Sequence, residues 1–205
     1  MSQQQKPFVV VAGNIGTGKT TVTARLADEL GLHAVLDRAS ENPYLNRFYS
    51  DPPRSPRQWA FHSQLFFLVD GLRQQRRIES DRGGVVQELS IYEHFMVMAH
   101  DQRDQGWISD EDFQLLSGLF FSVEDLLIRP DLLVLLEAPV DLLARRAVDR
   151  PGITPEYLAR LQDRYRAFAD GWLHSPVLRI DTTRTDVTTE TGLDEAAQLV
   201  ISRLR

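Results

Sequence analysis

The chain of 205 residues contains no cysteine, and its only lysines are Lys6 and Lys19. The absence of cysteine excludes disulfides, a thiol nucleophile and a cysteine-based metal site, and it is compatible with the reducing cytoplasm. Residues 1–7 lack the apolar core of a secretory signal. No uncharged apolar run approaches the ~18 residues of a membrane span, because the run 132–136 is followed by Glu137. We therefore expect a cytoplasmic protein without a membrane partner.

Positive charge is also scarce, since 23 Lys and Arg residues stand against 29 Asp and Glu residues, a net charge of −6. An acidic balance argues against a nucleic-acid partner. The hydrophobic content of 42% and the charged content of 25% are ordinary for a globular protein. A chain of this length is typical of one domain with a large core, so we expect a single domain over residues 1–205.

A phosphate-binding motif is the clearest feature that the chain does contain. It consists of Gly13, Asn14, Ile15, Gly16, Thr17, Gly18, Lys19 and Thr20. The pattern G-x-x-x-x-G-K-[ST] lies between an apolar strand, 8–12, and a helical pattern, 20–30, as it does in phosphate loops. Backbone N–H groups and the helix N-terminus of such a loop bind phosphate oxygens. The lysine reaches the outer phosphates and the threonine hydroxyl ligates Mg²⁺, so the motif predicts a nucleoside triphosphate with Mg²⁺.

Strand and helix patterns alternate along the chain, which predicts an α/β fold with a five-stranded parallel sheet and helices on both faces. The predicted strands are 8–12, 33–36, 85–88, 132–136 and 177–180. The predicted helices after the first are 55–77, 110–127, 155–172 and 194–204, with a polar loop at 181–191.

Charged residues at the ends of these strands are candidates for the site, because ligands of such sheets bind at the carboxyl ends of the strands. Asp37 follows the second strand and can accept a proton from a substrate hydroxyl, although a helix N-cap or turn role fits the position equally. Glu88 ends the third strand and can hold Mg²⁺ through a water opposite Thr20, or it pairs with an arginine. Arg146 and Arg150 are spaced to share one helix face and clamp a phosphoryl group, or they form a solvated basic face.

With these residues in place, the chain resembles the deoxynucleoside kinases over nearly its whole length, and most closely their bacterial deoxyadenosine/deoxyguanosine kinase branch. The segment 37–45 resembles the bacterial E-P-V-E-x-N-P-Y-[FL] segment, whose first acid is the general base. The resemblance implies that Asp37 is the base and Glu41 a second acid, with Asp37 one methylene shorter than the family's glutamate. It also implies a P-loop kinase fold.

The resemblance supplies the acceptor half of the site. Tyr49 matches the tyrosine that binds the sugar 3′-hydroxyl. Gln64 matches the glutamine of W-x-F-x-x-Q that pairs with the nucleobase, and Phe61 and Phe67 are the implied walls around the base. The implied substrate is therefore a deoxynucleoside.

Two further segments match parts of the family that surround the phosphates. Arg146 and Arg150 match the R-x-x-x-R pattern of the lid, placed at about 145–153, which is shorter here and lacks a third arginine. Asp181 begins the segment 181–189, which resembles the loop over the adenine of ATP.

The chain departs from the family pattern at three positions. The segment 88–90 stands where the family has [ED]-R-S, so the acid is kept and Leu89 replaces the arginine. Gly71 and His94 occupy positions where many members carry an arginine and an aspartate that bind the base. The candidate substitutes are Asp70, Glu93 and His94.

The resemblance implies ATP-dependent phosphorylation of the 5′-hydroxyl of a deoxynucleoside, with purines favoured, in nucleotide salvage by a homodimer. Lys19, Arg146 and Arg150 are the implied catalytic cations. A nucleoside monophosphate kinase similar to thymidylate kinase stays open, and would need a cationic site near Arg38 and Arg47. A non-catalytic nucleotide-binding module is a weaker alternative. A switch GTPase is disfavoured because the chain has no N-K-x-D motif.

Overall fold

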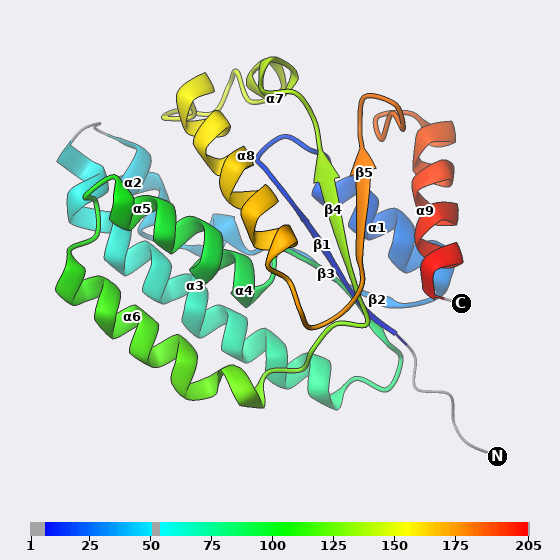
Figure 1. Cartoon of the computed structure of the whole chain (residues 1–205), viewed down its shortest axis with the longest axis horizontal. Coiled ribbons are helices and arrows are strands. Elements are labelled where there is room, and N and C mark those ends of the chain that lie inside the picture. Colours follow the sequence, from blue (N-terminus) through cyan, green and yellow to red (C-terminus); the bar gives the residue numbers. More distant parts are fainter. Residues whose placement is uncertain (1–6, 51–53, 205) are drawn as a thin grey trace.

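The structure is a computed structural model that describes residues 7–50 and 54–204. Its centre is one parallel sheet with strand order β2-β3-β1-β4-β5 (Figure 1). The strands are β1 (Phe8–Gly13), β2 (His33–Val35), β3 (Val85–Glu88), β4 (Leu132–Glu137) and β5 (Val177–Asp181). The predicted α/β fold with a five-stranded parallel sheet is confirmed.

Helices cover both faces of the sheet, because successive side chains of a strand point to opposite faces. Val9 and Val11 of β1 pack with Leu26 and Val200 on one face, whereas Val10 belongs to the core on the other. The helices of the first face are α1 (Lys19–Leu30) and α9 (Glu190–Leu204). The larger second face carries α3 (Arg54–Ser80), α4 (Ile91–Glu93), the π-helical segment η2 (His94–Ala99), α6 (Asp110–Val123) and α8 (Pro155–Asp170), with α5 (His100–Asp104) adjoining them.

Short elements at the carboxyl edge of the sheet complete the fold. They are η1 (Ala39–Glu41) and α2 (Leu45–Ser50) after β2, and α7 (Val140–Arg146) after β4. The phosphate loop turns into α1 through Gly18, whose φ of 93° lies in the left-handed region that favours glycine. The connections after β1, β2, β3 and β4 therefore meet at one edge, where ligands of parallel sheets bind.

Two predicted helix boundaries are wrong in the central and C-terminal parts of the chain. The helix expected to reach residue 127 ends at Val123 and gives way to a 3₁₀ turn, η3 (Glu124–Leu126). The last helix begins at Glu190, before the predicted residue 194. Its start is set by the Thr189 hydroxyl, which accepts a hydrogen bond from the N–H of Gly192 at 3.1 Å, a capping role hidden in a threonine-rich segment.

The lid region also differs from its prediction. α7 ends at Arg146, and the following residues 147–150 form a turn and a bend. The residue before a proline is disfavoured in helical conformation, and Pro151 follows this turn directly. Arg146 and Arg150 therefore do not share a helix face.

No helix within residues 7–50 and 54–204 is long and apolar enough to cross a membrane. The expectation about the first residues of the chain falls mainly on residues 1–6, which lie outside the described ranges.

Candidate active site

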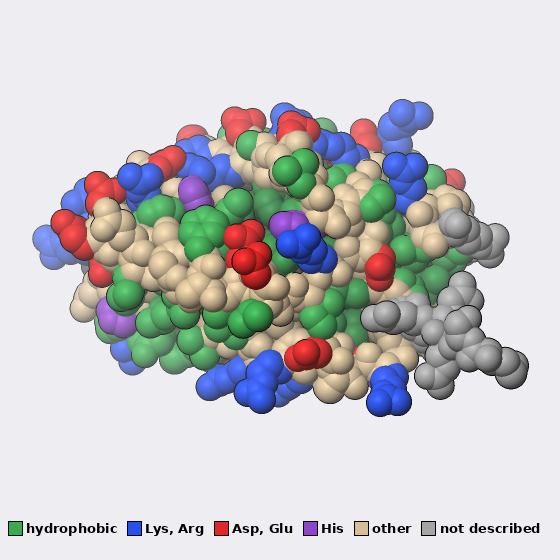
Figure 2. Space-filling model, turned by 60° about the horizontal axis from the view of Figure 1, so that its bottom comes forward, with side chains coloured by type: hydrophobic (Ala, Val, Ile, Leu, Met, Phe, Trp, Pro, Cys, Tyr) green, Lys and Arg blue, Asp and Glu red, His purple; other side chains and the backbone are tan. Residues whose placement is uncertain are grey.

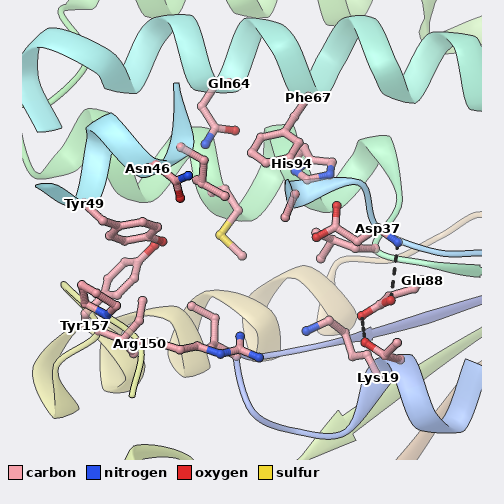
Figure 3. A pocket seen from close by; sticks show the side chains of 18 of the residues that line it. Lys19, Asp37, Asn46, Tyr49, Gln64, Phe67, Glu88, His94, Arg150 and Tyr157 are labelled. Carbon is pink, nitrogen blue, oxygen red and sulfur yellow. Dashed lines mark hydrogen bonds between the residues drawn. The ribbon is translucent and has the colours of Figure 1, made fainter. Parts of the chain in front are cut away.

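A cavity of about 890 Å³ opens at the carboxyl edge of the sheet (Figure 3), a size typical of small-molecule sites. Figure 3 shows Gln64 and Phe67 of α3 on one side of it and Lys19 and Arg150 on the opposite side. Nine predicted site residues line this one cavity: Ile15, Lys19, Thr20, Asp37, Tyr49, Gln64, Phe67, Glu88 and Arg150. The structure thus brings together residues that lie far apart in the sequence.

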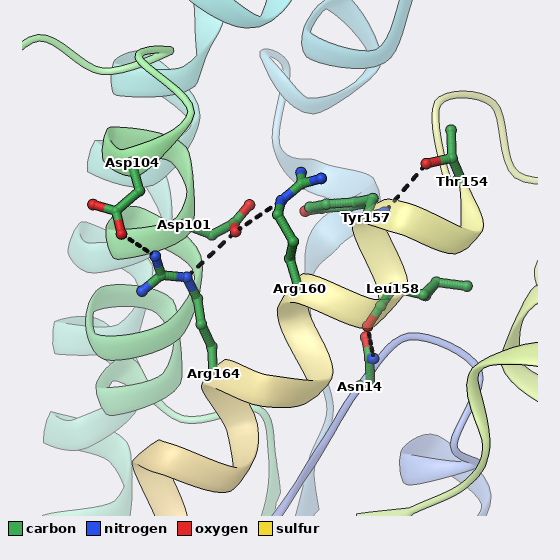
Figure 4. Close-up of polar contacts among 8 residues, drawn as sticks. All are labelled: Asn14, Asp101, Asp104, Thr154, Tyr157, Leu158, Arg160 and Arg164. Carbon is green, nitrogen blue, oxygen red and sulfur yellow. Dashed lines mark hydrogen bonds and ion pairs between the residues drawn. The ribbon is translucent and has the colours of Figure 1, made fainter.

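The phosphate loop is held in shape by Asn14, which is 3% exposed. Its carbonyl oxygen accepts hydrogen bonds from Lys19 Nζ at 3.0 Å and from the Thr17 hydroxyl at 2.9 Å. Its side-chain oxygen accepts from the N–H of Ile15 at 2.8 Å, and its side-chain nitrogen donates to the carbonyl of Leu158 at 2.8 Å (Figure 4). The loop is therefore tied directly to α8.

Gly13 is required where the loop leaves β1. A Cβ atom at this position would lie 2.6 Å from the carbonyl oxygen of Leu136, a separation that real structures avoid. Gly16 has room for a Cβ, but its φ of 84° favours glycine.

Three acidic or hydroxyl side chains meet beside Lys19. The Thr20 hydroxyl donates to one Glu88 carboxylate oxygen at 2.7 Å, and the backbone N–H of Asp37 donates to the other at 3.4 Å. Burial, and next the charge of Glu88, raise the pKa of Asp37 to about 6. Burial lowers the pKa of Lys19, against the opposing effect of the carboxylates around it.

The Thr20 and Glu88 pair has the chemistry that Mg²⁺ requires. Mg²⁺ in phosphate sites is held by hard oxygen donors, commonly one or two protein ligands together with substrate phosphates and waters. A hydroxyl and a carboxylate oxygen 2.7 Å apart at the end of the phosphate loop supply such donors. The described residues therefore fit a Mg²⁺ ion that enters with the nucleotide.

Glu93 is fully buried, and its charge acts on Lys19. One of its carboxylate oxygens accepts from the N–H and the hydroxyl of Ser90, at 2.8 and 3.2 Å, as the capping box that begins α4. Burial raises the pKa of Glu93 to about 7. Glu93 is not among the side chains that line the cavity.

The acceptor end of the cavity is aromatic and neutral. Tyr49 of α2 and Tyr157 of α8 point toward each other there (Figure 3). Burial raises the pKa of both tyrosines, so both hydroxyls stay protonated near pH 7. The Phe67 ring stacks on His94, with centroids 4.3 Å apart and an angle of 8° between the rings. These rings form the walls of a pocket suited to a flat ligand.

Besides Glu93, two predicted substrate residues lie outside the cavity lining. Glu41 is exposed and pairs with Arg38, which also contacts the buried Asp70 at 3.2 Å. Phe61 packs edge-on against His62 with centroids 5.7 Å apart. The structure therefore groups Asp37, and not Glu41, with the phosphate loop.

Part of the phosphate loop does not line the cavity, namely Gly13, Asn14, Gly16, Thr17 and Gly18. Arg146 and Asp181, also predicted to act on the nucleotide, lie outside it as well. Arg146 donates to the carbonyl of Gly16 at 3.2 Å. Asp181, at the end of β5, accepts from the N–H and the hydroxyl of Thr183. The loop that follows β5 reaches the motif through Val187, which packs against Gly18.

Sequence reasoning missed several residues that line the cavity. They are Leu36, Ala39, Leu45, Asn46, Ser50, Met98, Gln102, Asp149, Pro151, Ile153 and Tyr157. Most of these are apolar or neutral side chains, which local patterns do not distinguish from the core. Tyr157 is an example, because the position of a tyrosine in the first turn of α8 carries no signal that it faces a ligand.

α8 is fixed to the opposite wall by a cluster of charges. Asp101, which is 1% exposed, accepts from Arg160 at 3.4 Å and from Arg164 at 3.3 Å (Figure 4). Arg164 also pairs with the exposed Asp104. The cluster joins α8 to α5, and so it sets where Tyr157 and the Asn14 contact lie.

A parallel sheet with a glycine-rich phosphate loop after its first strand defines a P-loop nucleotide-binding fold. The chain matches the deoxynucleoside kinase family over residues 9–201 and belongs to this family of kinases.

Individual relatives agree with this assignment. A deoxyadenosine/deoxycytidine kinase of Bacillus subtilis (strain 168) is 31% identical over 206 residues, covering 94% of this chain and 93% of the relative. A deoxyguanosine kinase of Lactobacillus johnsonii is 26% identical over 211 residues, covering 96% and 92%. A solved deoxyadenosine kinase of M. mycoides, with dCMP and dCDP bound, superposes with a TM-score of 0.79 at 18% identity over 96% of this chain and 97% of that one. That likeness shows the shared fold.

Proposed function

We propose that this protein transfers the γ-phosphoryl group of ATP to the 5′-hydroxyl of a deoxynucleoside. The observation that carries the proposal is the single cavity in which Lys19, Thr20 and Asp37 lie together with Tyr49 and Gln64. The first three residues suit a phosphoryl donor, and the last two suit the sugar and base of an acceptor. A site of this composition supports transfer between two bound substrates.

The cations act on the donor. In phosphoryl transfer most catalysis comes from positioning and from stabilising charge on the transferred group. Lys19 and Arg150 line the cavity from the same side, and Arg146 donates to the Gly16 carbonyl, which keeps its guanidinium next to the phosphate loop. Thr20 and Glu88 would hold a Mg²⁺ ion, which would supply positive charge to neutralise the phosphates.

Asp37 acts on the acceptor. Its carboxylate lines the cavity beside Lys19 and Glu88, and a base within reach of the 5′-hydroxyl removes the proton as the new bond to phosphorus forms. The Tyr49 hydroxyl binds the sugar, and Gln64 faces the base between Phe67 and the strand edge. Closure of the segment 149–153 over this end excludes water from the phosphoryl group.

A monophosphate kinase finds less support in the charges of the site. The two arginines that its acceptor phosphate would use are engaged elsewhere: Arg38 pairs with Glu41 and Asp70, and Arg47 lies 4.8 Å over the Trp59 ring. Neither arginine lines the cavity. The acceptor end is thus neutral, which favours a nucleoside over its monophosphate.

A purine is the favoured base, with deoxyadenosine or deoxyguanosine as the acceptor. The curated relatives are named for deoxyadenosine, deoxycytidine or deoxyguanosine, and the cavity of about 890 Å³ has the volume for two fused rings. Nucleotide salvage in the cytoplasm is the setting that we propose, because ATP and free deoxynucleosides are both available there.

A homodimer is the assembly that we propose. α6 exposes Leu115 by 63% and Phe121 by 57%, and Val69 of α3 is 38% exposed. Figure 2 shows hydrophobic side chains interspersed with charged ones on the surface, where a partner can cover them. Light scattering during size-exclusion chromatography tests this assembly, and a monomeric mass at micromolar concentration overturns it.

The direct test is incubation with ATP, Mg²⁺ and a panel of nucleosides and nucleoside monophosphates, with quantification of the phosphorylated products. We expect turnover of deoxyadenosine or deoxyguanosine to the 5′-monophosphate. Lys19→Met is the matched control, which keeps a long unbranched side chain but removes the charge. Turnover confined to monophosphates overturns the proposal, as does an activity that Lys19→Met leaves unchanged.

A further inference from the structure

Among the described residues, His94 is one of three buried side chains of the cavity that have a polar atom without a hydrogen-bond partner, together with Gln64 and Gln102. It begins the π-helical segment η2 and is 6% exposed, yet it lines the cavity. Its ring is held flat against Phe67, and Nδ1 has no hydrogen-bond partner among the described residues. Buried polar atoms in proteins are almost always hydrogen-bonded, so an orphaned ring nitrogen beside a cavity indicates a ligand partner.

The neighbouring Gln64 has the same deficiency. Its side chain is 2% exposed, lines the cavity, and its Oε1 has no partner among the described residues. Figure 3 shows Gln64, Phe67 and His94 at the same end of the cavity, away from Lys19. The two unsatisfied polar side chains can hydrogen-bond to the edge of a nucleobase, and the adjacent aromatic ring can contact its face.

The candidate acids Asp70 and Glu93 do not face the cavity, although Oε1 of Glu93 has no partner among the described residues. Asp70 accepts from Arg38 at 3.2 Å and from Gln74 at 2.8 Å, and Glu93 caps α4. Neither lines the cavity. Gly71 leaves no space for a side chain, because a Cβ there would lie 2.8 Å from the Cβ of Ile91. Asp70 and Glu93 therefore do not face the cavity to read the base, whereas the unpartnered side chains of His94 and Gln64 do.

His94 is uncharged in this position. Burial, with the charge of Lys19 as the second cause, lowers its pKa to about 3. A neutral imidazole carries one donor and one acceptor nitrogen, and their places exchange when the tautomer changes. A carboxylate, in contrast, only accepts. The stack on Phe67 fixes the plane of the ring, while the proton is free to sit on either nitrogen.

We propose that His94 is a specificity-determining residue that, together with Gln64, binds both 6-amino and 6-oxo purines. An adenine edge offers a donor at N6 beside a ring-nitrogen acceptor, and a guanine edge offers an acceptor at O6. The Gln64 amide meets either edge by turning over, because it has both a donor and an acceptor group. His94 follows by changing its tautomer, accepting from the amino group or donating to the oxo group.

This inference rests on the proposed function, and its test compares three deoxynucleosides with ATP: deoxyadenosine, deoxyguanosine, and purine 2′-deoxyriboside, which lacks any group at position 6. The readout is kcat/KM, supported by nucleoside Kd from calorimetry. His94→Phe keeps an aromatic ring for the stack but has no polar atom. His94→Asn is the matched variant, because its amide keeps one donor group and one acceptor. Thermal melting shows that each variant is folded.

We expect wild type to prefer both substituted purines over purine 2′-deoxyriboside by about tenfold, the value of one well-placed hydrogen bond. His94→Phe should reduce both preferences about threefold or more, leaving the share that Gln64 contributes, and His94→Asn should retain them. Equal preferences in wild type and His94→Phe overturn the inference while leaving the proposed function intact. If His94→Phe loses the preference for only one of the two purines, the inference that His94 binds both is overturned. A folded wild type that phosphorylates none of the three overturns the proposed function and this inference together.

Discussion

At the scale of single residues, Asp37 illustrates how burial prepares a group for catalysis. Burial and the charge of Glu88 raise the pKa of its carboxyl to about 6, and the charge of Lys19 opposes this effect. A base works best when its pKa lies near the operating pH, and perturbed acids in a cleft are typical of functional sites. Asp37 therefore has both the place and the proton affinity that the proposed role requires.

The first prediction concerns the identity of the base. Asp37→Asn should lower kcat by at least ~10²-fold and change the KM for the nucleoside little, because the amide keeps the size of the side chain but cannot take the proton. Steady-state kinetics with ATP and deoxyadenosine measures both values. Glu41→Gln is the matched control, and we expect kcat within about twofold of wild type, since Glu41 is exposed and paired with Arg38. The reverse pattern would move the role to Glu41.

The second prediction concerns pH. Asp37 is active as a base only when it is ionised, so kcat/KM should rise with pH through about 6, the raised pKa of Asp37, and then level off. An unperturbed aspartate, with a pKa of about 3.9, would place this rise near two units lower. The profile is measured from pH 4.5 to 9 in buffers of constant ionic strength. A flat profile across pH 5–7 contradicts the assignment.

At the scale of elements, the segment 149–153 is joined to the acceptor end by one close contact. Gly152 has a φ of 77°, and a Cβ on it would lie 2.6 Å from Cδ1 of Tyr49. The glycine thus lets the chain pass directly over the tyrosine ring. A side chain at position 152 would therefore have to displace the Tyr49 ring.

The third prediction separates this contact from backbone strain. Gly152→Ala should raise the KM for the nucleoside about tenfold or more, since displacing Tyr49 by an ångström is costly. Gly106 has a φ of 65° and open space around it, so Gly106→Ala carries a similar left-handed strain of roughly 1–2 kcal/mol without the clash. We expect it to lower the melting temperature and leave kinetics unchanged. Similar kinetics for the two variants would contradict the contact's role.

Elements differ in how well the sequence predicts them. Each of the five strands begins at its predicted residue and ends within one residue of its predicted end, because apolar runs between Gly, Pro and Ser are strong strand signals. The ends of α6 and α7 and the start of α9 are less predictable. They depend on a 3₁₀ turn, on the residue before Pro151 and on the Thr189 cap, which hydrophobic periodicity does not register.

The two halves of the site also differ in how well the sequence predicts them. The donor half follows from a contiguous motif and from the strand ends at Asp37 and Glu88. The acceptor half was predicted only through family resemblance, because its residues come from helices separated in sequence. That His94 stacks on Phe67 and that Tyr157 faces Tyr49 are results of tertiary packing, and no local pattern in the chain contains them.

At the scale of the whole molecule, α8 connects the phosphate loop, the acceptor end and the outer helices. Asn14 contacts its backbone at Leu158, Tyr157 faces the cavity, and Arg160 and Arg164 hold it to Asp101. The positions of both halves of the site therefore depend on this one helix.

The fourth prediction tests this anchoring. Asp101→Asn should lower the free energy of unfolding by about 1–3 kcal/mol, less than for a fully buried pair because both arginines are partly exposed. Asp104→Asn, which removes an exposed partner of Arg164, should change it by less than about 0.5 kcal/mol. Urea denaturation followed by circular dichroism measures both. Equal losses in the two variants would show that the buried position of Asp101 contributes nothing.

The hydrogen bonds of Asn14 bear on how quickly the nucleotide binds. The loop keeps its shape through contacts within the protein, so it does not have to fold around the phosphates, and little ordering entropy is lost when they bind. When ATP binds, Lys19 exchanges its contact with the Asn14 carbonyl for a contact with phosphate. We expect association at a rate limited by encounter, with dissociation setting the affinity. Removing the Asn14 side chain should slow capture of ATP far more than it speeds release.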